Sequence, residues 1–231
     1  MKAQRTETPT RGTLHVPRKG ASNVPHEHDQ DSDPPRTAVP PVEQTGSRGS
    51  QGIWNWPSES QEAARLVIDQ YGEPDEATET QLIWHRPGPW KRIVATKMFF
   101  KHNFPAPHID SVESVIDYRV PVDKFTALAE FDGSVVVERT AGEVSARCHD
   151  EQANFIALNL MHDVVTGAKS VKEARDYYAK EFGDYRPKKP TPYMERLRFT
   201  PGEGNTADLD SRLLSDADLE KAAEEGNKRA K

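Results

Sequence analysis

Residues 81–101 read QLIWHRPGPWKRIVATKMFFK, and this stretch decides the fold. Two runs rich in strand-forming side chains, 81–86 and 91–101, flank the turn sequence Pro87-Gly88-Pro89, which predicts a β-hairpin. Because alternate residues of a strand share a face, the second run has two predicted faces. One carries Val94, Thr96, Met98, Phe100 and His102, and the other carries Ile93, Ala95 and Phe99. Both faces are largely apolar, so we expect this strand inside a sheet rather than at its edge.

Farther along the chain, hydrophobic spacing predicts a second hairpin and several helices. Residues 134–140 and 143–148 turn at Ala141-Gly142 and form the clearest hairpin pattern in the chain. Residues 111–120 fit either a helix start or a strand, and we favour a strand from about 114 after a tight turn. The predicted helices cover 59–71, 125–131, 150–166 and a segment that begins with the capping box of Ser170 and Glu173.

Strands and helices follow one another without the regular alternation of a parallel sheet. We therefore predict an α+β fold, in which helices pack on a mainly antiparallel sheet of about five strands. Residues 1–51 contain no Phe, Trp, Tyr or Ile, so they bury too little apolar surface to offset the entropy of ordering, and we predict a disordered tail. One domain is expected over 52–183. A mostly disordered tail follows at 184–231, with a short helix near 216–225.

Charge and composition exclude several classes of function. The net charge is −6, and the two predicted tails are close to neutral, so the central domain is acidic and disfavours binding to nucleic acid. Cys148 is the single cysteine, which precludes an internal disulfide and fits a reducing cytoplasm. No apolar run approaches the roughly 18–20 residues of a membrane span, and no secretory signal is evident. We expect a cytoplasmic protein without a membrane segment.

The loop after the central strand, His102-Asn103-Phe104-Pro105-Ala106-Pro107-His108-Ile109-Asp110, carries the strongest indication of chemistry. Imidazole and carboxylate groups suit Zn, Fe or Mn, and a catalytic metal centre needs three protein ligands and one open position. The prolines reduce the entropy that the loop loses when it binds. This pattern predicts a divalent metal site formed by His102, His108 and Asp110. Candidates for a fourth ligand are Glu113, Asp117 and His85, and Glu113 is also the candidate catalytic base.

Each of these residues also has a purely structural interpretation. His102 can be a histidine at the edge of the core, His108 a plain loop residue, and Asp110 the cap of the turn that follows it. The spacing matches no standard metal motif. A second tract, the His- and Asp-rich residues 26–33, is typical of a solvated segment that binds metal weakly.

Two further sets of residues are candidate sites. Trp84 and Trp90 lie within the first hairpin and can line a ligand-binding groove together with His102 and His108, although such aromatics are more often core residues. Cys148 shares its predicted strand face with apolar residues, which favours an inert buried thiol. The chain has no G-x-G-x-x-G, P-loop, G-x-S-x-G or C-x-x-C motif, so nucleotide-fold enzymes and classical hydrolases have no positive support.

Several short segments resemble a family of uncharacterised bacterial proteins. They are Trp84-His85, Trp90-Lys91-Arg92, His102-Asn103-Phe104-Pro105, Ile116-Asp117-Tyr118-Arg119-Val120-Pro121 and Val137-Glu138-Arg139-Thr140. The resemblance covers about residues 54–182. It implies a bacterial origin and similar domain limits, and it carries no established activity that can be transferred to this chain.

Three functions from different classes follow from these patterns. The first is a cytoplasmic protein that binds a small molecule or a protein partner through the Trp-rich hairpin and the 102–110 loop. The second is a metal-dependent enzyme, a hydrolase or an oxidoreductase, with a site of two histidines and one aspartate. The third is an adaptor that acts through its tails while the central domain serves as a scaffold.

Overall fold

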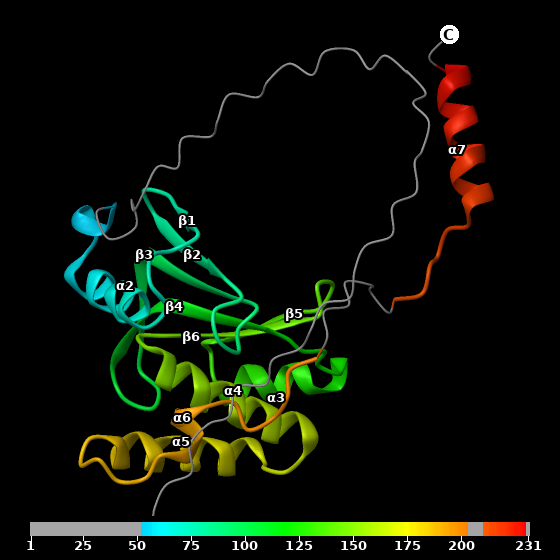
Figure 1. Cartoon of the computed structure of the whole chain (residues 1–231). Coiled ribbons are helices and arrows are strands. Elements are labelled where there is room, and N and C mark those ends of the chain that lie inside the picture. The colour runs from blue at the N-terminus through cyan, green and yellow to red at the C-terminus, as the bar shows by residue number, and fades with distance from the viewer. Residues whose placement is uncertain (1–51, 203–209, 230–231) are drawn as a thin grey trace, which may run out of the picture. The chain divides into compact units, whose positions relative to one another are not determined.

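The computed structural model describes residues 52–202 and 210–229 (Figure 1). The predicted tail at 1–51 lies outside the described residues. The elements in chain order are η1 (Ile53–Asn55), α2 (Ser58–Tyr71), β1 (Glu76–Ala77), β2 (Gln81–His85), β3 (Arg92–His102), β4 (His108–Asp117), η2 (Val122–Lys124), α3 (Phe125–Phe131), β5 (Val135–Glu138), β6 (Glu143–Cys148), α4 (Glu151–Thr166), α5 (Val171–Tyr185), α6 (Pro192–Glu195) and α7 (Asp216–Arg229).

The strands form one antiparallel sheet in the order β1-β2-β3-β4-β6-β5. This confirms the α+β fold with an antiparallel sheet and packed helices. The sheet has six strands rather than about five, because the two-residue strand β1 pairs with the outer edge of β2. Strand β3 lies between β2 and β4, as its two apolar faces predicted.

The pairing of β3 with β4 changes register within β3. Ala95 pairs with Val112, whereas Phe100 pairs with Asp110, so residues 96–99 of β3 lie opposite the single residue Ser111 of β4. Paired residues of two antiparallel strands point to the same face, and successive residues alternate between faces. The regular alternation of faces along β3 is therefore interrupted across residues 96–99. This irregularity is the structural origin of the candidate site described below.

The predicted face assignment of β3 is consequently wrong at its end. Val94 pairs with Glu113, and His102 pairs with His108, so Val94 and His102 lie on opposite faces of the sheet. A strand of constant register would have placed them on the same face. Periodicity alone cannot show the irregularity, because it depends on the pairing partner and not on the spacing of apolar residues.

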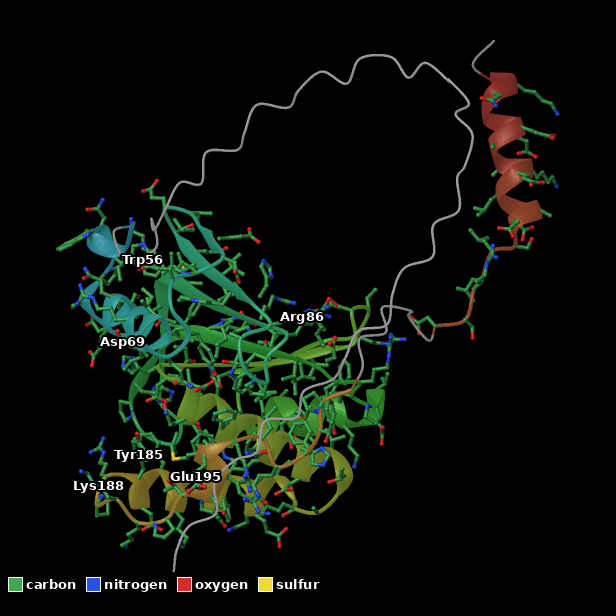
Figure 2. The ribbon with its side chains drawn as sticks, viewed as in Figure 1. Trp56, Asp69, Arg86, Tyr185, Lys188 and Glu195 are labelled. Atoms are coloured by element: carbon green, nitrogen blue, oxygen red, sulfur yellow. The ribbon has the colours of Figure 1, made fainter. Side chains whose placement is uncertain are left out.

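Helices α2 and α4 cover the face of the sheet that holds Ile93 and Val112, and Figure 2 shows the side chains that fill the space between the sheet and the helices. The hydroxyl of Tyr71 in α2 donates a hydrogen bond to the buried carboxylate of Glu151 in α4. The side chain of Asn154 in α4 donates to the backbone carbonyl of Val112. These bonds fix both helices against the sheet beside a single apolar core.

The helix ends follow the sequence signals. Ser170 and Glu173 form the predicted capping box at the start of α5. The Asp150 side chain accepts a hydrogen bond from the backbone N–H of Ala153 at the start of α4. Gly167 ends α4 with φ of 78°, in the left-handed region that glycine adopts at little cost.

The packed part of the chain continues beyond residue 183, the predicted end of the domain. Met194 in α6 is buried, and the Asn159 side chain in α4 donates hydrogen bonds to the backbone carbonyls of Tyr193 and Arg196. The apolar residues of this segment are few and lie among prolines and charged residues, so the sequence pattern does not predict that the segment packs on the domain. Helix α7 covers the predicted 216–225 and extends to Arg229. None of the helices in the described ranges is long and apolar enough to cross a membrane.

Candidate metal centre

The end of the β3–β4 hairpin brings the two histidines together. His102 and His108 are directly paired strand residues, and only residues 103–107 form the connecting loop. Strand β4 begins at His108, earlier than the predicted start near 114. Asp110 is therefore a strand residue, and the alternative that it caps a turn is wrong. His102, His108 and Asp110 lie on one face because they occupy alternate, paired positions.

The three side chains converge on a small volume. Nδ1 of His102 lies 3.4 Å from Oδ2 of Asp110, and Nε2 of His108 lies 3.1 Å from Oδ1 of the same carboxylate. One ligand atom from each residue lies within 4.8 Å of the others. Ligand bonds of about 2.0–2.2 Å place donor atoms about 3–4 Å apart, so a separation of 4.8 Å has to close by about 1 Å. Rotation of one imidazole ring supplies a movement of this size.

The outer nitrogen of each imidazole faces an oxygen acceptor. Nδ1 of His108 lies 2.8 Å from the backbone carbonyl oxygen of Ala106, which fixes its hydrogen on that side. Nε2 of His102 lies 3.6 Å from Oδ1 of Asp132. In metal sites the ligating histidine usually directs its other nitrogen at a carbonyl or carboxylate, which sets the tautomer and orients the ring. His108 has this arrangement through its hydrogen bond to Ala106, whereas His102 faces Asp132 at a distance too long for a hydrogen bond. Both rings leave the inner nitrogen turned toward Asp110.

Three buried atoms at this site have no hydrogen-bond partner: Nδ1 of His102, Oδ1 of Asp110 and Oδ2 of Asp132. The 3.1 Å approach of His108 to Asp110 is an ion-pair distance without hydrogen-bond alignment. Asp110 is 5% exposed and Asp132 is 2% exposed. A buried polar atom without a partner costs about 1–3 kcal/mol, so such atoms are rarely concentrated in one place without a function.

The electrostatics of the cluster favour a cation. Two carboxylates and two imidazoles carry a net charge of about −2 when the imidazoles are neutral. Burial lowers the pKa of His108, but the Asp110 carboxylate and the Ala106 carbonyl raise it by more, and the net direction is upward. Burial raises the pKa of Asp132, although hydrogen bonds from Ser134 oppose the shift. The buried carboxylate of Asp132 thus occupies an environment that a positive charge would stabilise.

Asp132 is the residue of this cluster that sequence reasoning missed. It follows α3 directly, where an aspartate is unremarkable in the sequence. The backbone N–H and the hydroxyl of Ser134 both donate to its Oδ1, which holds the carboxylate toward His102. No local signal distinguishes this aspartate from an ordinary one, because its role depends on the packing of α3 beside the end of β3.

The three candidates for a fourth ligand lie elsewhere. Glu113 accepts a hydrogen bond from Ser145 Oγ at 2.5 Å on the opposite face of β4 from Asp110, so it is also misplaced for a catalytic base at this site. Asp117 forms a 2.6 Å ion pair with Lys91. His85 is exposed on β2, with Nε2 2.5 Å from Glu76.

Trp84 and Trp90 are core residues, which corrects the prediction that they bind a ligand. Each is 2% exposed. The indole N–H of Trp84 donates to the Gly72 carbonyl at 2.9 Å, and that of Trp90 donates to Glu151 at 2.5 Å. Buried indoles need such partners, and the helix-covered face supplies them.

The thiol of Cys148 is buried beside the cluster. Burial, followed by the nearby charges of Asp132 and Asp110, raises its pKa well above the ordinary value. Its sulfur lies 4.0 Å from Ser134 Oγ. A neutral, inaccessible thiol has little nucleophilic character, in agreement with the inert cysteine expected from its apolar strand face.

No family model matches this chain, and no curated protein or solved structure is similar enough to count as a match. The resemblance of residues 54–182 to a family of uncharacterised bacterial proteins therefore stays a prediction.

Proposed function

We propose that this protein binds one divalent transition-metal ion of the Zn, Fe or Mn class at the end of the β3–β4 hairpin. Nδ1 of His102, Nε2 of His108 and the Asp110 carboxylate would be the ligands. Asp132 would orient His102, and the Ala106 carbonyl would orient His108. The observation that carries the proposal is the orientation of both imidazoles, each with its outer nitrogen at an acceptor and its inner nitrogen at Asp110.

The form of this site resembles catalytic rather than structural metal sites. Three protein ligands leave at least one coordination position open, whereas structural zinc sites use four protein ligands. The side chains of His102 and His108 are 19% and 16% exposed, so water and small molecules can approach them. An ion bound here would act as a Lewis acid or activate water, which supports a metal-dependent enzyme as the use of the site.

Calorimetric titration of the chelator-treated full-length chain with Zn²⁺ and Mn²⁺ at mildly alkaline pH tests the proposal. The chain should carry His26→Ala and His28→Ala, because the 26–33 tract can bind metal by itself. We expect one ion per chain. His102→Ala and His108→Ala should each abolish this binding, since two remaining ligands hold an ion weakly.

His85→Ala is the matched control, because His85 is also a strand histidine beside a carboxylate but lies outside the cluster. It should leave the stoichiometry and affinity unchanged. The proposal fails if the two cluster variants bind the ion as the unmodified site does, or if all three histidine variants lose binding equally.

A further inference from the structure

A groove lies on the other face of the sheet, away from the metal centre. Its volume is about 780 Å³, within the range of about 300–1,000 Å³ that is usual for small-molecule sites. Its lining residues include Val94 and Glu113, a directly paired couple on the face opposite Asp110. Other lining residues are Thr96, Met98, Phe100 and Arg147.

The apolar wall of the groove comes from the irregular part of β3. Met98 is 68% exposed and Phe100 is 49% exposed, although both are large apolar side chains in the middle of a long strand. The register shift between Ala95 and Phe100 removes this segment from regular pairing and displaces its side chains from the core. Adjacent exposed apolar groups in a concave surface are typical of a binding site.

Arg147 supplies a cationic group to this groove. Its guanidinium lies 5.2 Å from the ring centre of Phe100. Its nearest carboxylate oxygen, on Glu113, is 3.6 Å away, which is too long for a hydrogen bond. The other oxygen of Glu113 is occupied by Ser145. Within residues 52–202 and 210–229, the guanidinium makes no hydrogen bond.

The geometry points to a ligand of defined chemistry in this groove: a small organic carboxylate with an aromatic or branched aliphatic body. The forked donors of an arginine match the two oxygens of a carboxylate. The body of such a ligand would lie on Phe100 and Val94, while its charge meets Arg147. Lys97, whose Nζ lies 3.7 Å from a carboxylate oxygen of Glu79, also lines the groove. None of the proposed metal ligands lines the groove, so this inference does not rest on the metal site, although Phe100 is paired with Asp110.

Titration of the full-length protein with phenylacetate, followed by backbone amide NMR shifts, tests the inference, and phenylacetamide is the neutral analogue. We expect the carboxylate to shift the amide signals of Val94, Phe100 and Arg147, and to bind at least about tenfold more tightly than the amide. Arg147→Gln should weaken binding about tenfold to a hundredfold, since hydrogen bonds to a charged group are lost.

Two variants make the test specific. Glu113→Gln keeps an acceptor for Ser145 but removes the charge that competes for Arg147, so it should tighten phenylacetate binding about twofold to fivefold. Arg65→Gln on α2, where the guanidinium bonds only Gln61 among the described residues, should leave binding unchanged.

Several results would overturn the inference. Phenylacetate and phenylacetamide could bind with equal affinity, Arg147→Gln could keep full affinity, or Glu113→Gln could bind phenylacetate more weakly. Absence of phenylacetate binding at about 10 mM, ten times a Kd of about 1 mM, would also overturn it. If Arg147→Gln does not fold, Arg147→Lys replaces it. Lysine keeps the charge without the fork, so binding to that variant should be intermediate between wild-type and no binding, and full wild-type affinity would contradict the proposed contact.

Discussion

Two acidic side chains lie at each end of the β3–β4 strand pair, and the partners of these carboxylates differ between the two ends. At the start of β3, Lys91 contacts Asp117 at 2.6 Å and Glu143 at 2.8 Å, and Arg92 forms two hydrogen bonds with Glu143. At the far end, the charged or titratable partners of Asp110 and Asp132 among the described residues are imidazoles at distances of 3.1–3.6 Å, and Ser134 also donates to Asp132.

This difference distinguishes a cluster of charges that stabilises the fold from a cluster that is suited to binding an ion. The four charges of the first cluster, which we call the matched cluster, satisfy one another and need no further ion. The second cluster of His102, His108, Asp110 and Asp132, which we call the unmatched cluster, has a carboxylate excess and unpartnered buried atoms. A protein that stabilises only its fold would pair these carboxylates as it pairs those of the matched cluster.

Metal addition should give the largest difference between the clusters. At a free Zn²⁺ concentration about one hundred times Kd, the free energy of unfolding should rise by about 2.7 kcal/mol, because the ion binds only the folded site. Urea denaturation with and without Zn²⁺ measures it. His102→Ala should remove the gain, while Glu143→Gln in the matched cluster should keep it. An equal gain in His102→Ala would place the ion elsewhere.

Neutralising a carboxylate of the matched cluster should destabilise the protein. Glu143→Gln removes charge-assisted bonds to Arg92 and Lys91 from a side chain that is only 10% exposed. We expect a loss of about 1–3 kcal/mol in the free energy of unfolding. The comparison with Glu138→Gln, an exposed neighbour on β5, separates this effect from a general change of surface charge. Equal losses in both variants would show that the matched cluster is not special.

Neutralising a carboxylate of the unmatched cluster should have the opposite sign. Asp132→Asn keeps the acceptor oxygen for Ser134 but removes a buried charge, so the metal-free protein should gain about 1 kcal/mol in the free energy of unfolding. Its affinity for Zn²⁺ should fall about tenfold to a hundredfold, because His102 loses its orienting carboxylate. A variant that loses stability without metal, or keeps full affinity, would break the distinction between the clusters.

The smallest expected effect is the pH dependence of the matched cluster. The hydrogen bonds from Arg92, followed by those from Lys91, lower the pKa of Glu143 below its ordinary value of 4.5. The unfolded chain therefore binds a proton on this residue at a higher pH than the folded protein does. The stabilisation is complete above about pH 4.5 and is lost as the pH falls through the lower folded-state pKa.

Urea denaturation at several acidic pH values should accordingly show a shallower decline for Glu143→Gln than for the wild-type chain. Parallel curves for the two proteins would mean that Glu143 does not contribute to acid sensitivity.

The sequence predicted much of the fold and most of the candidate site for local reasons. The order of apolar residues in 81–101 was enough to place β3 inside the sheet, and Ser170 with Glu173 was enough to begin α5. His102, His108 and Asp110 were predicted together because they are close in the chain, with only a short loop between the histidines.

The remaining features depend on contacts between distant segments. Asp132 reaches His102 only through the packing of α3, and the indoles of Trp84 and Trp90 find their hydrogen-bond acceptors only once the helices cover the sheet. The groove around Arg147 depends on a register change that apolar periodicity does not record. Alternation predicts which residues share a face only while the pairing of two strands stays constant.

The irregular segment 96–99 also divides β3 into two parts that pair with β4 in different registers. Before it, the odd-numbered Ile93 and Ala95 face the helices, and after it, His102 shares that face, whereas the ring of Phe100 lies against Arg147. Loss or gain of a single residue inside this segment would carry the histidine at the end of β3 to the other surface of the sheet, although every ligand side chain stays in the sequence. The length of this segment therefore sets the chemistry of the hairpin as much as the identity of its ligands does.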